Sequence, residues 1–212
     1  MKGLGPGFFL HMETSLNTLL VPVNTEGKKT DLFHAVTENS IGDAIKTFER
    51  AHARLLEPQC WHELAGMISA RFSIDGKDRI VHVNDHIKID IPGPGPSAGE
   101  GFDWVRVEFM DENVIGSADE SFGIKVRACN NPAKVSEGVA HFFTGHATSS
   151  FLIQRNEKTV TASYHGRNEI PNTSEVKLTD KIRNAMVATA AISGISELQW
   201  KALLNGLLQK DG

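Results

Sequence analysis

The sequence predicts an α+β fold in which a bent antiparallel sheet or small β-barrel of about seven strands fills the middle of the chain, covered by N-terminal and C-terminal helices. Two observations predict it. Apolar residues recur every three or four positions near both ends, as in amphipathic helices, and alternate with polar residues between positions 68 and 165, as in half-buried strands. Short connections between these strands favour antiparallel pairing. At 212 residues the chain can bury a core without disulfides, and we treat it as one domain.

The first block, residues 16–67, is predicted to be mainly helical. Its strongest helix begins near Ser40, which can cap the N-terminus, and its apolar face consists of Ile41, Ala44, Ile45, Phe48, Ala51 and Leu55. Pro58 ends this helix and suits the first turn of a second, short helix that ends near Gly66. Upstream of them we expect a short strand at 19–23, and a short helix at 31–36.

The second block, residues 68–165, is predicted to form the strands. Asp75-Gly76 lies between two alternating segments, which indicates a hairpin turn. Strict alternation continues around 87–91, and further strands are expected at 103–110, 121–129, 147–155 and 158–165. Between them, the segment 92–101 contains three prolines and four glycines, and we expect a loop there.

The third block, residues 174–209, is predicted to be helical again. A first amphipathic helix ends at Gly194, and Ser196 can cap a second helix. The apolar face of that second helix consists of Leu198, Leu203, Leu204, Leu207 and Leu208. Helices with such faces pack on a core, and we expect both to cover the sheet.

The N-terminus has no targeting signal that we recognise. Its apolar run spans only Phe8 to Leu10, and no window approaches the eighteen apolar residues of a membrane span. We therefore expect a cytoplasmic protein without a membrane partner. Residues 1–15 are expected to form a flexible extension, with Met1 or Met12 as the start.

Composition restricts the partners and the redox state. The net charge is −4 and the pI is near 6.1, so we expect no nucleic-acid partner. The two cysteines, Cys60 and Cys129, follow no CxxC spacing and are expected to be reduced thiols.

Three histidines near the end of the strand block are candidates for a site. If the strands at 147–155 and 158–165 form a hairpin, His165 comes near His146, and His141 with Glu169 could complete a metal site. No HExxH or HxH spacing supports this arrangement. We therefore expect hydrogen-bonded histidines, with no metal and no cofactor.

Nucleophilic catalysis has no local signature here. Ser149, Ser150 and Cys129 lie outside GxSxG, SxxK and Cys-His motifs, although a triad can also assemble from distant segments. The loop 92–101 lacks the phosphate-loop patterns, and its prolines remove backbone donors that a phosphate requires. Whether the protein is an enzyme is left open by these patterns.

Two surfaces remain as candidates for binding. Trp104 and Arg106 share the strand face opposite Val105 and Val107, so Trp104 is either partly exposed on a contact surface or covered by a terminal helix. The second is a polar corner between the last strand and the helical block, where clustered charges suit either an internal network or an anionic ligand. Its residues are Arg167, Asn168, Glu169, Asn172, Asp180, Arg183 and Asn184.

These patterns favour a non-enzymatic binding or interaction module that uses the sheet edge, Trp104 and the 92–101 loop toward a protein partner, and they leave room for a homodimer. The alternative is an enzyme or a small-ligand binder, for an anion or a metal, that uses the three histidines and the Arg167/Asn168/Glu169 corner. A deep pocket lined by those residues would favour the alternative, and a flat exposed patch would favour the interaction module.

Overall fold

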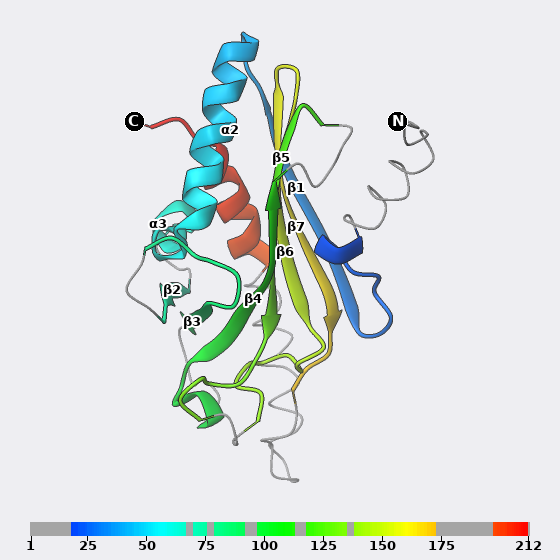
Figure 1. The fold of residues 1–212 in the computed structure, drawn as a ribbon, viewed down its shortest axis with the longest axis vertical. Coiled ribbons are helices and arrows are strands. Elements are labelled where there is room, and N and C mark those ends of the chain that lie inside the picture. Colours follow the sequence, from blue (N-terminus) through cyan, green and yellow to red (C-terminus); the bar gives the residue numbers. More distant parts are fainter. Residues whose placement is uncertain are drawn as a thin grey trace, which may run out of the picture.

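The computed structural model describes residues 18–66, 70–75, 79–91, 97–112, 118–134, 138–172 and 197–211. Within these residues, seven strands form one sheet in the order β1-β7-β6-β5-β4-β3-β2, and every neighbouring pair is antiparallel (Figure 1). The predicted α+β class is therefore confirmed. The strands are β1 (Lys28–Thr37), β2 (Arg71–Ile74), β3 (His86–Asp90), β4 (Asp103–Glu112), β5 (Glu120–Ala128), β6 (Thr148–Asn156) and β7 (Thr159–Glu169).

The helix predicted after Ser40 is present as α2 (Ile41–Leu56). The hydroxyl of Ser40 accepts a hydrogen bond from the Asp43 N–H and so caps its first turn. After α2 the chain forms a short 3₁₀ turn, η1 (Pro58–Cys60), and then α3 (Trp61–Ala65), which ends at Gly66 as predicted. A second 3₁₀ turn, η2 (Ser97–Gly99), precedes β4. The C-terminal helix is described over residues 197–208.

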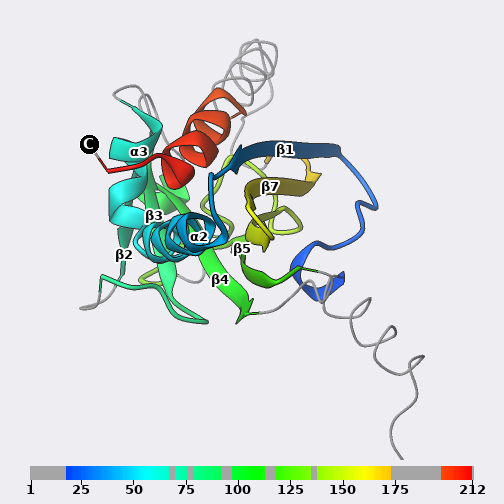
Figure 2. The same ribbon diagram turned by 90° about the horizontal axis from the view of Figure 1, so that it is seen from above.

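The helices cover one face of the curved sheet. Figure 2 shows α2 and the C-terminal helix on the same side of it. The main core lies in this layer and joins the apolar faces of both helices to the inward side chains of the strands, including Ala44, Phe48, Ala51, Leu55, Val107, Ile124, Phe151, Ile153, Leu203, Leu204, Leu207 and Leu208. The opposite, outer face is partly covered by the segment before β1, where Leu20 packs on Leu152.

Three expectations about local structure are wrong. Residues 31–36 belong to strand β1 rather than to a helix, and the segment 19–23 is not a strand. The Asp75-Gly76 hairpin does not form as predicted either, because β2 pairs with β3, and residues 79–83 are not a strand. Val81 is instead buried, and its N–H donates to the carbonyl oxygen of Leu56 at the end of α2.

The last strand is longer than the sequence predicted. β7 does not end at His165 but continues to Glu169. In its register with β6, Arg167 lies opposite Thr148 and His165 lies opposite Ser150. Several predicted features lie outside the described residues: the extension 1–15, the whole helix predicted to end at Gly194 with Asp180, Arg183 and Asn184, and part of the 92–101 loop.

Candidate functional site

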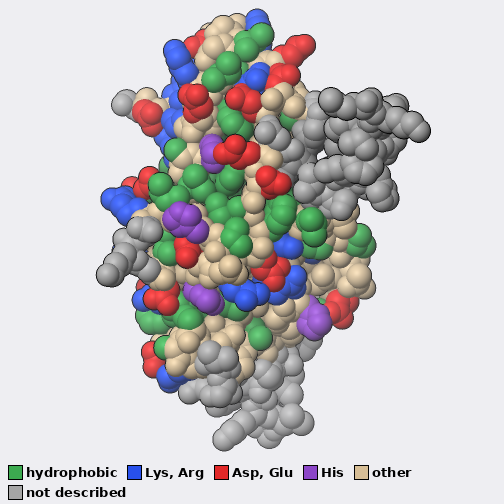
Figure 3. All heavy atoms as spheres, in the orientation of Figure 1, with side chains coloured by type: hydrophobic (Ala, Val, Ile, Leu, Met, Phe, Trp, Pro, Cys, Tyr) green, Lys and Arg blue, Asp and Glu red, His purple; other side chains and the backbone are tan. Residues whose placement is uncertain are grey.

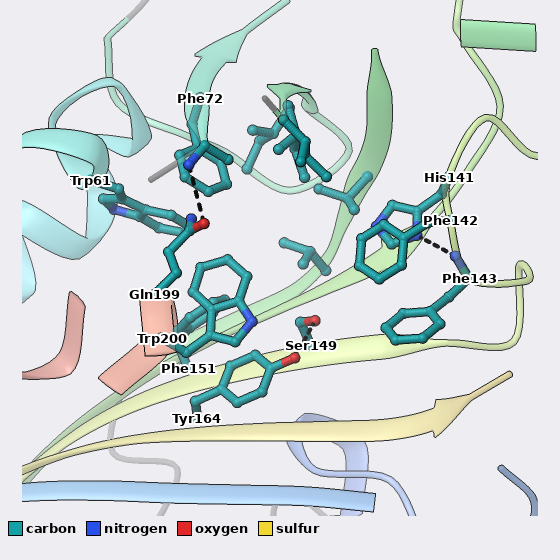
Figure 4. Close-up of a pocket in the computed structure, with 16 residues that line it drawn as sticks. Trp61, Phe72, His141, Phe142, Phe143, Ser149, Phe151, Tyr164, Gln199 and Trp200 are labelled. Carbon is teal, nitrogen blue, oxygen red and sulfur yellow. Dashed lines mark hydrogen bonds between the residues drawn. The ribbon is translucent and has the colours of Figure 1, made fainter. Parts of the chain in front are cut away.

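A cavity of about 130 Å³ lies between the inner face of the sheet, α3 and the C-terminal helix (Figure 4). Every strand from β2 to β7 contributes to its wall. The side chains that line it are those of Trp61, Ala70, Phe72, Ile87, Ile89, Ile91, Val105, Val126, His141, Phe142, Phe143, Ser149, Phe151, Tyr164, Gln199 and Trp200. None of these described residues is Asp, Glu, Lys or Arg, and most of their side chains are apolar, so the wall is mainly apolar and uncharged.

Aromatic rings form one end of the cavity. The ring of Trp200, on the C-terminal helix, stacks on Tyr164 at a centroid distance of 5.2 Å and meets Phe151 edge-on at 5.2 Å. Trp61 lies 5.1 Å from Phe151 and 5.2 Å from Phe72. Aromatic pairs prefer offset-stacked and edge-to-face arrangements, which stabilise them beyond the burial of their surface. The rings therefore form a fixed apolar surface on this side of the cavity.

A chain of hydroxyl groups leads from the cavity into the sheet. The Ser149 hydroxyl lies 3.1 Å from the Tyr164 hydroxyl, which donates to the Glu169 carboxylate at 3.2 Å. The other oxygen of Glu169 accepts from the Thr30 hydroxyl at 2.8 Å. Burial raises the pKa of Glu169, and burial together with the Glu169 charge raises the pKa of Tyr164. Since Tyr164 donates to Glu169, the Ser149 proton is the one that lies between Ser149 and Tyr164.

His141 lies at the other end of the cavity from Trp61 and Phe72 (Figure 4). It is 7 % exposed, and its Nδ1 accepts a hydrogen bond from the Phe143 N–H at 2.9 Å. An acceptor nitrogen carries no proton, so the neutral ring has its hydrogen on Nε2. Burial lowers the pKa of His141 to about 3, which keeps the ring neutral at physiological pH.

Hydrogen bonds from both the backbone and side chains fix the segment that carries His141. The Ala140 carbonyl oxygen accepts from the Trp104 N–H at 2.7 Å, and the Phe142 N–H donates to the Asp103 carboxyl at 2.7 Å. The Asn172 side chain donates to the His141 carbonyl oxygen at 3.1 Å. The ring of Phe142 also stacks on the His141 ring at 4.4 Å. The imidazole is therefore held in one orientation.

The other two candidate histidines are elsewhere. His165 lies on the outer face, where its Nδ1 is 2.6 Å from the Asp31 carboxylate and its Nε2 is 3.1 Å from the Ser163 hydroxyl. His146 is exposed, and its Nδ1 lies 3.8 Å from the Glu26 carboxylate. No group of three or more His, Cys, Asp or Glu in the described part of the chain is placed to hold a metal ion. The structure therefore does not bring the three histidines together.

Arg167 forms an internal network with partners that the sequence did not suggest. Its guanidinium donates to the Asp31 carboxylate at 2.6 Å and to the carbonyl oxygens of Thr30 and Gly166 at 3.0 and 2.8 Å. Burial raises the pKa of Asp31, but hydrogen bonds from His165 and Arg167 outweigh burial and hold this pKa at about 2. This arrangement ties the edge strand β1 to β7.

The His165 ring bonds to the Ser163 hydroxyl through one nitrogen and to the Asp31 carboxylate through the other, the arrangement of a hydrolase triad. Ser163 is only 2 % exposed, however, and Arg167 shares the Asp31 oxygen. A nucleophile must meet its substrate, so we interpret this group as part of the strand network.

Asn168 and Asn172 also serve the backbone. Asn168 has a positive φ of 54°, and its side-chain oxygen accepts the N–H groups of Thr25 and Glu26 at 2.8 and 3.2 Å. It therefore ties the turn before β1 to the end of β7. Asn172 spans the carbonyl oxygens of Val139 and His141. Both asparagines position the chain around the cavity without lining it.

Of the two alternatives considered for Trp104, partial exposure on a contact surface is not found. Trp104 is 8 % exposed, and the described residues with which it packs include Ala98 and Ala140, which lie outside the helices predicted for the two ends of the chain. Arg106, on the same strand face, is about half exposed and lies 3.7 Å from Glu108. The surface proposed from these two residues therefore lacks its aromatic anchor.

Two further expectations concern the thiols and the surface charge. Cys60 and Cys129 are both free, and burial raises the pKa of Cys129 to about 12. Figure 3 shows Lys, Arg, Asp and Glu side chains interspersed over one face of the described residues, without a broad field of one sign. Within the same residues, no helix combines the length and the apolar character that a membrane span requires.

Sequence reasoning identified one cavity residue as a site candidate, His141, and missed the aromatic wall. Trp61, Phe151 and Trp200 occupy apolar positions of helices or strands, which predict burial without telling a filled core from a hollow one. One usable signal for the aromatic wall was that the large side chains of Trp61 and Trp200 belong to the two helical blocks on either side of the strand block in the sequence.

No family model matches the sequence, and no curated protein matches it. A hypothetical protein of Helicobacter pylori has a similar solved structure, with 12% identity, a TM-score of 0.50, and coverage of 85% of this chain and 86% of that one. This likeness is one of fold. A protein of Arthrobacter aurescens aligns at 10% identity and a TM-score of 0.41, covering 89% and 91% of the two chains. A START superfamily protein of Mycobacterium smegmatis aligns at 8% identity and a TM-score of 0.40, covering 85% and 99%.

Proposed function

We propose that this protein binds a small, largely apolar molecule in the cavity between the sheet and the C-terminal helix. The observation that carries the proposal is the cavity itself, a space of about 130 Å³ in the main core that is lined by aromatic and aliphatic side chains. Well-packed protein interiors contain few voids larger than a water molecule. An engineered apolar cavity of about 150 Å³ holds a benzene molecule, so this space accommodates a ligand of roughly that size.

The polar groups around the cavity are mostly engaged with the protein. Gln199 accepts the Ala70 N–H at 3.1 Å through its side-chain oxygen, and Ser149 and Tyr164 bond to each other. Ligand pockets commonly have an apolar wall with a few placed polar groups. The lining described here follows that pattern, and it favours a small-molecule binder over the interaction module, whose Trp104 anchor is buried.

Filling the cavity tests the proposal. Val126→Phe adds an aromatic ring from β5 into the space, and Thr161→Phe adds the same ring on the outer face of β7, because Val160 and Ala162 point inward. We expect small aromatic hydrocarbons such as α-methylstyrene to bind the wild-type protein and Thr161→Phe with similar affinity in calorimetric titrations. Val126→Phe should bind at least about tenfold more weakly. Equal binding by both variants would place the ligand elsewhere and contradict the proposal.

A further inference from the structure

We propose that His141 selects the ligand of this cavity, and that the ligand is an uncharged molecule with an apolar, ring-sized body and a hydrogen-bond acceptor, such as a carbonyl oxygen, that receives the Nε2–H of His141. This inference rests on the proposed function, since it names the class of ligand that the same cavity takes.

The first argument is the unused donor. Because Nδ1 accepts the Phe143 N–H, the ring hydrogen is on Nε2, and no described residue accepts a hydrogen bond from Nε2. His141 is more than nine-tenths buried and lines the cavity. The Nε2 atom itself is not fully buried, so its hydrogen is accessible from the cavity, where water or a ligand can accept it. A ligand oxygen at this end of the cavity would supply the missing acceptor.

The second argument is that the donor is preorganised. The His141 carbonyl oxygen is held by Asn172, and the neighbouring Phe142 N–H is held by Asp103. Phe142 covers the imidazole on one side, with an angle of 22° between the two rings. A donor that is already fixed loses little entropy when it bonds to a ligand, and so contributes to selectivity.

The third argument concerns charge. None of the described lining residues is Lys or Arg, and burial disfavours the protonated form of His141. A carboxylate would enter without a cation to balance it, which is costly in an apolar site. At the cavity wall Ser149 directs its hydrogen toward Tyr164 and so offers lone pairs, which repel a carboxylate. A neutral carbonyl or hydroxyl compound satisfies His141 without that cost.

A matched pair of probes tests the inference. Acetophenone and α-methylstyrene have the same number of heavy atoms and a similar shape, and differ in that a carbonyl oxygen in the first replaces a methylene group in the second. Dissociation constants for both are measured by calorimetry with the wild-type protein and with His141→Phe, which keeps a flat ring and removes the donor. Comparing the ratio of the two constants between the two proteins cancels the cost of removing the carbonyl from water, because that cost enters both ratios equally.

We expect His141→Phe to shift this ratio against acetophenone by about tenfold, the effect of one buried hydrogen bond. We also expect benzoate to bind the wild-type protein at least about tenfold more weakly than acetophenone at pH 7. A shift of less than about twofold, or benzoate binding as tightly as acetophenone, would overturn the inference and leave the proposed function standing. If neither acetophenone nor α-methylstyrene binds the wild-type protein, the proposed function fails.

A measurement on the unmodified protein covers the case in which His141→Phe does not fold. The Nε2–H of His141 gives its own proton resonance because the ring is neutral and buried. Acetophenone should move this resonance downfield as the hydrogen bond forms, whereas α-methylstyrene should not. The same displacement with both probes, or with neither, would contradict the inference.

Discussion

The carboxyl of Asp103 accepts the Phe142 N–H at 2.7 Å, so an acidic residue at the start of β4 holds the backbone beside His141. Asp103 is buried, and burial raises its pKa to about 7 from 3.8, against the opposing effect of the Phe142 N–H. The contact therefore couples the protonation of one carboxyl group to the wall of the cavity.

This coupling predicts a pH dependence. Between pH 3.8 and about 7 the folded protein binds a proton at Asp103 that the unfolded chain does not, so its contribution to stability is present at low pH and is lost as the pH rises through 7. Asp103→Asn keeps an acceptor oxygen for Phe142 and cannot ionise. From pH 5 to pH 8 the wild-type protein should lose about 2–3 kcal/mol of unfolding free energy relative to this variant. Urea denaturation at both pH values measures the difference, and a difference that is constant with pH would refute the assignment.

Arg167→Ala should destabilise the protein strongly. The variant loses hydrogen bonds to Asp31 and to two backbone carbonyl oxygens in a buried place, and we expect a loss of roughly 2–4 kcal/mol in unfolding free energy. Arg106→Ala is the matched control, because Arg106 is about half exposed, and its pair with Glu108 should contribute roughly 0–1 kcal/mol. A neutral Arg167→Ala would show that these bonds do not support the fold and would reopen this corner as a binding site.

Removal of the C-terminal helix should prevent folding. Four leucines of this helix are buried in the main core: Leu203, Leu204, Leu207 and Leu208. The burial of each side chain contributes about 1.5–3 kcal/mol to the free energy of unfolding. Their sum is comparable with the typical stability of a domain, roughly 5–15 kcal/mol. A chain ending at residue 196 should be insoluble or lack a cooperative thermal transition. A chain ending at Gln209 loses only the ion pairs of Lys210 and Asp211, and should melt nearly as the full chain does. Cooperative melting of the shorter chain would show the helix to be peripheral.

Gly206→Ala should destabilise the protein although alanine favours helices. A Cβ at this position would lie 2.4 Å from the Leu64 carbonyl oxygen and 2.9 Å from its carbonyl carbon, so the C-terminal helix must move away from α3. We expect a cost of about 1–3 kcal/mol. Gly42→Ala in the first turn of α2 meets nothing closer than the Ser40 hydroxyl at 3.8 Å, and should stabilise by up to about 1 kcal/mol. Thermal melts that shift in the same direction for both variants would contradict the close contact.

The sequence predicted the sheet well where alternation was regular. In β3 and β4, the apolar positions Ile87, Ile89, Val105 and Val107 face the core as expected. Strand β1 was missed because Phe33, beside the buried Leu32, is 64 % exposed and interrupts the alternation. Tertiary pairing with β7 then decides the conformation of a segment whose own pattern is ambiguous.

The site was less predictable than the fold. The charged corner was recognised, but Arg167 pairs with Asp31, which lies 136 residues earlier in the chain. His141 was a candidate for metal binding or hydrogen bonding, and its role at the cavity depends on a bond from Phe143 and on packing that no spacing rule contains. The hollow arises from the way the helices and the strands meet, which local periodicity does not encode.

Strand β1 has a consequence for the order in which the chain can assemble. It is the first of the seven strands to leave the ribosome, yet its hydrogen-bonding partner β7 begins 122 residues after Thr37, at Thr159. At roughly 5–20 residues per second, synthesis leaves β1 without its partner for roughly 6–24 seconds. During that time, charged side chains on β1 discourage its pairing with a neighbouring chain; they are those of Lys28, Lys29 and Asp31. Because β7 is the strand with which β1 pairs, β1 cannot take its place in the sheet until the last of the seven strands has been made.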